Sequence, residues 1–240
     1  MAWHDTGVRG ALAILSALFV ISGCGNQQDA LPQPMTTNFL ALGDSYTIGE
    51  SVEPSERWPV HLAKVLRERG VKVDDPMIIA RTGWTTDELS AAMDQAKVDG
   101  QRFELVTLLI GVNDQYRGRS VEAYRPQFEA MLKRAIKLAG DRPSHVIVLS
   151  IPDWGVTPFA ASSRRDPAQV GREIDAFNRV NRELALAAGA RYVDVTPISR
   201  GSATQPAALL AADGLHPSGT MYAQWAGLAL EQAEQGMRSK

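Results

Sequence analysis

Residues 41–50 read ALGDSYTIGE, a short apolar run that ends in Gly43-Asp44-Ser45 and is followed closely by Gly49. Gly, Asp and Ser are common turn residues, each for its own conformational reason. A turn at the end of a strand can also present a serine hydroxyl as a nucleophile. The rest of the sequence has to distinguish these two interpretations of Ser45.

Strand-like and helix-like segments alternate along the chain. Short apolar runs typical of strands lie at 39–42, 77–80, 105–110, 145–151 and 191–195. Helical spacing occurs at 58–69, 121–138, 174–188 and 222–235, and in a segment through Leu89 and Met93 that Thr85 or Thr86 can cap. This alternation predicts a doubly wound α/β sheet. In such sheets, ligand sites lie at the carboxyl ends of the strands.

Polar residues and glycines follow the predicted strands. The segments are Gly43-Asp44-Ser45 after the first, Thr82-Gly83-Trp84 after the second, Gly111-Val112-Asn113-Asp114 after the third, and Asp213-Gly214-Leu215-His216-Pro217 before the last helix. Each segment alone is an ordinary turn. Their order and their placement past the strands together indicate a site.

Over residues 38–240, these segments resemble the sequence blocks of the SGNH hydrolases, also called GDSL esterases and lipases. The family's nucleophilic Ser, its Gly, its Asn and its Asp-x-x-His pair match Ser45, Gly83, Asn113, Asp213 and His216. The first block departs at Tyr46, where many members have Leu. The resemblance implies a flavodoxin-like, three-layer α/β/α sandwich with a mostly parallel five-stranded sheet. It also implies a serine hydrolase that cleaves esters or thioesters without a metal.

The same residues suit acyl transfer on chemical grounds. A serine hydroxyl needs a base to take its proton, and His216 is the candidate because imidazole titrates near working pH, roughly 6 to 7. Asp213, three residues earlier, can hold that imidazole in one tautomer. The backbone N–H groups of Ser45 and Gly83 and the side-chain amide of Asn113 are candidate donors to the oxyanion.

Other residues near these segments are less decisive. Asp44 and Asp114 are expected to be structural. The aromatic residues close to the motifs could line an acyl or alcohol pocket or pack in the core: Tyr46, Trp84, Tyr116 and Trp154. The chain has no Gly-x-Ser-x-Gly elbow, which argues against an α/β-hydrolase. It has no HExxH or Cys-rich cluster, so we expect neither a metal site nor a cofactor.

The first 37 residues do not look like part of the fold. The apolar run at 11–22 is shorter than the about 20 residues of a spanning helix and has the length of a signal-peptide core. The junction Ile21-Ser22-Gly23-Cys24 resembles the lipobox of bacterial lipoproteins, with Cys24 as the acylated residue. We therefore expect a signal peptide at 1–23, a lipidated Cys24 with a flexible tether at 24–37, and a hydrolase domain at 38–240. An ordinary secretory leader or a signal anchor is the alternative.

These features predict a serine esterase anchored in the bacterial cell envelope, periplasmic or at the outer membrane or cell surface. Its substrate is a small-molecule, lipid or sugar ester, and the membrane contact is the lipid anchor. A lysophospholipase, a thioesterase, a polysaccharide O-deacetylase and a non-catalytic binding lipoprotein are the alternatives. The formal charge of −2 gives no sign of nucleic-acid binding. The sequence does not indicate an oligomeric state.

Overall fold

Five short segments form one parallel sheet in the computed structural model, which describes residues 38–238. The strands are β1 (Phe39–Gly43), β2 (Met77–Ala80), β3 (Leu105–Leu109), β4 (Val146–Leu149) and β5 (Arg191–Val193). Their order is β2-β1-β3-β4-β5, and every pairing is parallel. This is the strand order of flavodoxin-like folds, so the predicted fold class is confirmed.

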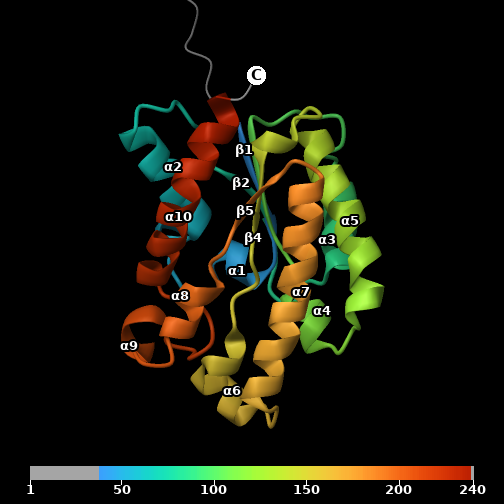
Figure 1. Cartoon of the computed structure of the whole chain (residues 1–240). Coiled ribbons are helices and arrows are strands. Elements are labelled where there is room, and N and C mark those ends of the chain that lie inside the picture. The colour runs from blue at the N-terminus through green and yellow to red at the C-terminus, as the bar shows by residue number, and fades with distance from the viewer. Residues whose placement is uncertain (1–37, 239–240) are drawn as a thin grey trace, which may run out of the picture. The chain divides into compact units, whose positions relative to one another are not determined.

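Helices cover both faces of the sheet. They are α1 (Ser45–Ile48), α2 (Trp58–Glu68), α3 (Thr86–Gln95), α4 (Val112–Tyr116), α5 (Val121–Leu138), α6 (Pro158–Ser162), α7 (Pro167–Ala187), α8 (Thr196–Gly201), α9 (Pro206–Leu209) and α10 (Gly219–Arg238). Short 3-10 turns lie at η1 (Pro54–Glu56), η2 (Pro143–His145) and η3 (Trp154–Val156). Helices α2 and α10 pack together on one face, and α3, α5 and α7 cover the other (Figure 1).

Burial explains the sequence pattern of these elements. Every residue of β1, β3 and β4 is buried, as strands covered on both faces require. On α2, Trp58, Leu62 and Leu66 are fully buried at four-residue spacing, which places them on one helix face. Burying each such side chain contributes roughly 1.5–3 kcal/mol. The apolar faces of the helices therefore hold the sheet in place from both sides.

Several predicted boundaries were wrong. The segment at 145–151 forms a strand only from Val146, because His145 belongs to a 3-10 turn that begins at Pro143. The helix expected from 174 begins at Pro167, where the Asp166 side chain accepts the N–H of Ala168 and caps it. Strand β5 ends at Val193, two residues early. The last helix begins at Gly219 rather than 222.

The predicted signal peptide, Cys24 and the tether lie outside the described residues. Within the residues that the structure describes, no helix is long and apolar enough to cross a membrane.

Candidate active site

Ser45 is the first residue of a one-turn helix that begins just after strand β1, which lies between β2 and β3. The Oδ1 atom of the Asp44 side chain accepts the N–H of Tyr46 at 3.0 Å and so caps this helix. Gly43 lets the turn form, because a Cβ there would clash with the Thr47 hydroxyl and with the Leu109 carbonyl on β3. The Gly-Asp-Ser sequence thus fixes Ser45 at the carboxyl edge of the sheet.

Asp213 and His216 form a tight pair in the loop between α9 and α10. The Asp213 carboxylate Oδ2 lies 2.6 Å from Nδ1 of His216. Its other oxygen accepts the backbone N–H groups of Leu215 and His216, both at 2.9 Å. A carboxylate at this distance is an acceptor, so Nδ1 carries the proton and Nε2 is left as a base.

Asp213 is held in its ionised form. Burial opposes ionisation, but hydrogen bonds from Ser51, from His216 and from two backbone N–H groups lower the pKa of Asp213 to about 2. The carboxylate therefore keeps its negative charge across the pH range in which an imidazole ordinarily titrates. It can orient His216 and stabilise the imidazolium form.

A cavity of about 170 Å³ brings most of the predicted site residues together. Ser45, Gly83, Asn113 and His216 all line it, although they come from four separate segments of the chain. Asp213 lies behind His216 as its hydrogen-bond partner. Among the described residues, no group of three or more His, Cys, Asp or Glu side chains could hold a metal ion.

The three candidate oxyanion donors are free to face this cavity. Within residues 38–238, the backbone N–H groups of Ser45 and Gly83 donate to no backbone carbonyl. Gly83 has φ of +87°, a conformation that favours glycine, and a Cβ there would point into open space. The Asn113 amide donates one N–H to the Trp84 carbonyl at 2.9 Å. Because the amide nitrogen carries two hydrogens, the second N–H remains available.

Three contacts hold the Gly83 loop, and none of them was predicted from the sequence. The Thr82 hydroxyl donates to the Glu50 carboxylate. The Arg117 guanidinium donates to the Gly83 carbonyl at 2.7 Å and to Glu88 at 3.1 Å. The Asn113 bond to Trp84 is the third contact. Neither Glu50 nor Arg117 belongs to a recognisable motif. Each forms its hydrogen bond with a residue about thirty positions away in the sequence, so no local pattern indicates the contact.

Ser51 also contacts the site, and no sequence motif marks it. Its hydroxyl donates to Oδ2 of Asp213 at 2.6 Å, the same oxygen that His216 approaches. Ser51 has φ of 65°, which is unusual for a residue with a Cβ. No local sequence signal connects it to Asp213, since 162 residues separate the two.

Of the four aromatic residues near the motifs, three line the cavity and Trp84 does not. Tyr46, Tyr116 and Trp154 line the cavity, together with Phe159 and Leu215, which the sequence did not single out. The Tyr46 ring packs on the His216 imidazole with centroids 5.5 Å apart. Trp84 is not part of the wall and supplies its backbone carbonyl to Asn113. Apart from the polar residues named above, the cavity is therefore lined mainly by aromatic and aliphatic side chains.

The two remaining acidic residues of the motifs make structural contacts. Asp44 is fully buried, and burial raises its pKa to about 8. Asp114 accepts the backbone N–H of Thr86 at the start of α3, at 3.0 Å, and pairs with Arg119 at 2.8 Å. Burial raises the pKa of Asp114 despite these bonds. Asp114 thus ties α4 to α3, which is the kind of capping contact expected from its sequence.

The fold is a doubly wound α/β domain that brings a serine, a histidine and an aspartate together at the carboxyl edge of a parallel sheet. The sequence model of the GDSL-like Lipase/Acylhydrolase family matches residues 41–224, and the chain belongs to that family. No curated protein matches the sequence.

Solved structures of low sequence identity share the fold. A member of the lipolytic protein G-D-S-L family from Veillonella parvula has a TM-score of 0.62 at 18% identity, over 81% of this chain and 96% of that chain. The lipase/acylhydrolase from Enterococcus faecalis has a TM-score of 0.62 at 21% identity, over 83% and 96%. Axe2, an acetylxylan esterase from Geobacillus stearothermophilus, has a TM-score of 0.58 at 18% identity, over 85% and 95%.

Proposed function

We propose that the protein is a serine esterase that hydrolyses carboxylic esters through an acyl-enzyme. The observation that carries this proposal is the shared cavity: Ser45 and His216 both line it, and Asp213 is bonded to the other ring nitrogen of His216. Family membership supports an acylhydrolase in general. The specific reaction and the residue roles below are our proposal.

In the first half-reaction, Nε2 of His216 takes the proton of the Ser45 hydroxyl as Oγ bonds to the ester carbonyl carbon. The carbonyl oxygen becomes an oxyanion, which accepts hydrogen bonds from the N–H groups of Ser45 and Gly83 and from the Asn113 amide. When the intermediate collapses, the carbon–oxygen bond to the alcohol breaks. The protonated His216 gives its proton to the departing alcohol.

In the second half-reaction, water attacks the acyl-enzyme. His216 takes a proton from the water as the new carbon–oxygen bond forms. The bond to Ser45 then breaks, Oγ regains a proton from His216, and the carboxylic acid leaves. The charge of Asp213 stabilises the imidazolium in both halves.

The cavity supports an ester with a short acyl group as the substrate. Its volume of about 170 Å³ is below the roughly 300–1,000 Å³ typical of sites for drug-sized ligands. A sugar acetyl ester fits this limit, and one structural neighbour is an acetylxylan esterase. Lysophospholipid and thioester hydrolysis use the same machinery and remain second candidates.

The experiment is hydrolysis of p-nitrophenyl acetate by residues 25–240. We expect turnover by the wild type and only background hydrolysis by Ser45→Ala. Ser202→Ala is a matched control, because Ser202 is also buried and its hydroxyl has no partner among the described residues. Equal rates in the wild type and Ser45→Ala would contradict the proposal and favour the non-catalytic binding lipoprotein.

We also propose that a lipid on Cys24 anchors the enzyme in the bacterial envelope, after removal of residues 1–23 as a signal peptide. The support is the sequence alone: the apolar run at 11–22 and the Ile21-Ser22-Gly23-Cys24 junction. Two acyl chains anchor a protein far more stably than one. We expect Cys24→Ser to move the protein from the membrane fraction to the soluble fraction, whereas retention in membranes would indicate a signal anchor.

A further inference from the structure

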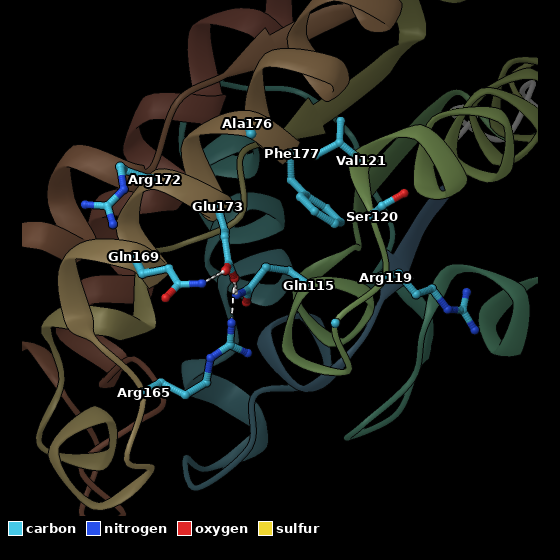
Figure 2. A pocket seen from close by; sticks show the side chains of 11 residues that line it. Gln115, Arg119, Ser120, Val121, Arg165, Gln169, Arg172, Glu173, Ala176 and Phe177 are labelled. Atoms are coloured by element: carbon cyan, nitrogen blue, oxygen red, sulfur yellow. Dashed lines mark hydrogen bonds and ion pairs between the residues drawn. The ribbon is translucent and has the colours of Figure 1, made fainter.

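A second cavity, of about 530 Å³, lies beside the catalytic one. It is formed by α4, by the chain that leads into α5, and by α7 (Figure 2). Two of its lining residues touch the wall of the catalytic cavity: Gln115 bonds to Trp154, and Arg165 bonds to the Tyr116 carbonyl at 3.3 Å. The side chains of Gln115, which lines the second cavity, and of Trp154, which lines the catalytic one, are therefore in direct contact.

Four of the polar side chains that line the second cavity are already paired with one another. Figure 2 shows Gln115, Gln169 and Arg165 converging on Glu173. The Gln115 amide donates to Glu173 at 2.5 Å, Gln169 at 2.8 Å and Arg165 at 2.6 Å. Arg119 and Arg172 also line the cavity, but their side chains extend away from this group (Figure 2). The cluster therefore serves as a support rather than as a set of free ligand-binding groups.

The hydrogen-bonded cluster around Glu173 holds the Trp154 side chain in place. The indole N–H of Trp154 donates to Oε1 of Gln115 at 2.9 Å, while Nε2 of the same amide donates to Glu173. The Glu173 bond thus fixes which way the Gln115 amide faces. The Arg165 guanidinium lies 5.8 Å from the centroid of the Trp154 ring, within range for a cation–π contact. Gln115 therefore contacts the edge of the Trp154 indole, and Arg165 contacts its face. The Trp154 residue is only 2% exposed.

We propose that Trp154 and Gln115 form the partition that limits the length of the acyl group, and that Glu173 is a positioning residue for this partition. This inference rests on the proposed esterase function. The acyl group is the relevant part of the substrate because it stays bonded to Ser45 between the two half-reactions, whereas the alcohol must leave to solvent. A buried wall suits the part that is retained. Removing the partition joins the small cavity to the larger one and admits longer chains.

The experiment compares kcat/KM for p-nitrophenyl acetate, butyrate, hexanoate and octanoate. Trp154→Ala should raise the octanoate-to-acetate ratio about tenfold or more, because a few methylene groups then gain room. Trp154→Phe, which removes the indole N–H and is less disruptive to folding, should shift the ratio in the same direction by less. Glu173→Gln should also shift it, through KM for the longer esters more than through kcat for acetate.

Trp225→Phe is the matched control. Trp225 is fully buried like Trp154, but it does not line either cavity, and its indole N–H has no partner among the described residues. The octanoate-to-acetate ratio of this variant should stay at the wild-type value. A second readout does not depend on catalysis: in the Ser45→Ala background, adding Trp154→Ala should give a thermal shift with octanoate that the single variant lacks.

The outcomes separate this inference from the proposed function. If Ser45→Ala keeps wild-type turnover, the serine mechanism fails. If Ser45→Ala is inactive but both Trp154 variants keep the wild-type ratio and gain no octanoate binding, the partition claim alone is overturned. A shift seen with esters of longer alcohols, but not of longer acids, would also overturn it.

Discussion

At the scale of single residues, the most unusual group beside Ser45, the proposed nucleophile, is a carboxyl whose pKa lies above 7. Asp44 is fully buried, and burial raises its pKa to about 8. One carboxyl oxygen accepts the N–H of Tyr46, and the other has no partner among the described residues. Its role is to cap α1 and so to fix the direction of Ser45, without placing a second negative charge beside the proposed oxyanion.

The raised pKa of Asp44 makes stability depend on pH. Folded Asp44 holds its proton up to about pH 8, whereas in the unfolded chain it releases the proton near pH 4. Its contribution to stability is therefore fully present below about pH 4 and is lost as the pH rises through 8. Between about pH 4 and about pH 8, the free energy of unfolding falls by about 1.4 kcal/mol per pH unit.

The Asp44→Asn substitution removes the pH dependence that Asp44 gives to stability. It keeps the cap on α1, because Asn caps helices as well as Asp does. Urea unfolding at pH 5 and pH 9 should show the wild type losing more stability than the variant over that interval. The same loss in both proteins would show that Asp44 is ionised in the folded state.

Ser51 provides a second prediction at this scale. Ser51→Ala removes the hydroxyl that bonds to Asp213 and leaves a Cβ at φ of 65°. Loss of a hydrogen bond worth about 1 kcal/mol should lower kcat/KM for p-nitrophenyl acetate roughly threefold to tenfold.

Ser51→Gly separates the hydroxyl from the backbone strain. It should lose the same activity, but it should unfold at a higher urea concentration than Ser51→Ala, because glycine adopts a positive φ without the steric cost of roughly 1–2 kcal/mol. Unchanged activity in both variants would show that the Ser51 bond does not position Asp213.

The sequence could locate Ser45, Gly83, Asn113, Asp213 and His216 because each lies in a short motif past a predicted strand or before the last helix. Ser51, Glu50 and Arg117 could not be located in this way. Their partners are distant in sequence, and their conformations depend on where loops from different strands meet. Motifs mark the residues that face the cavity, whereas the contacts that hold those residues follow from tertiary structure.

At the scale of elements, long periodic segments were predictable and single turns were not. The segment at 121–138 matches α5 because its apolar residues recur at helical spacing over eighteen residues. Helices α1 and α4 have four and five residues, too few to show a period. The early start of α7 was missed because its first buried apolar residue is Val170, three residues inside the helix.

The loop that carries Gly83 depends on Arg117, and this gives a prediction for an element rather than for a reacting group. Arg117→Ala removes the bond to the Gly83 carbonyl. We expect kcat to fall about tenfold, less than the roughly 10²–10³ lost with a whole oxyanion donor, and KM to change little.

Arg125→Ala is the control for Arg117→Ala. Arg125 pairs with Glu183 between α5 and α7, it lines none of the cavities described above, and its exposed ion pair should contribute less than about 1 kcal/mol. Its kinetics should equal those of the wild type. If the two arginine variants behave alike, the Gly83 loop does not depend on Arg117.

At the scale of the whole domain, the strand order brings the site together. β1 lies between β2 and β3, so the segments that follow these strands and carry Ser45, Gly83 and Asn113 are neighbours at one edge of the sheet. The Asp213–His216 loop comes from the far end of the chain and directly precedes α10, which packs against α2. Its position beside Ser45 therefore requires the complete domain.

The most direct test of the account is covalent trapping of the nucleophile. The protein is incubated with diethyl p-nitrophenyl phosphate, and the modified residue is identified by intact-mass and peptide mass spectrometry. We predict one diethylphosphoryl adduct on Ser45, none in Ser45→Ala, and much slower formation in His216→Ala but not in His61→Ala, whose histidine lies on α2 outside the cavity. An adduct on another residue, or equal rates with and without His216, would contradict the account.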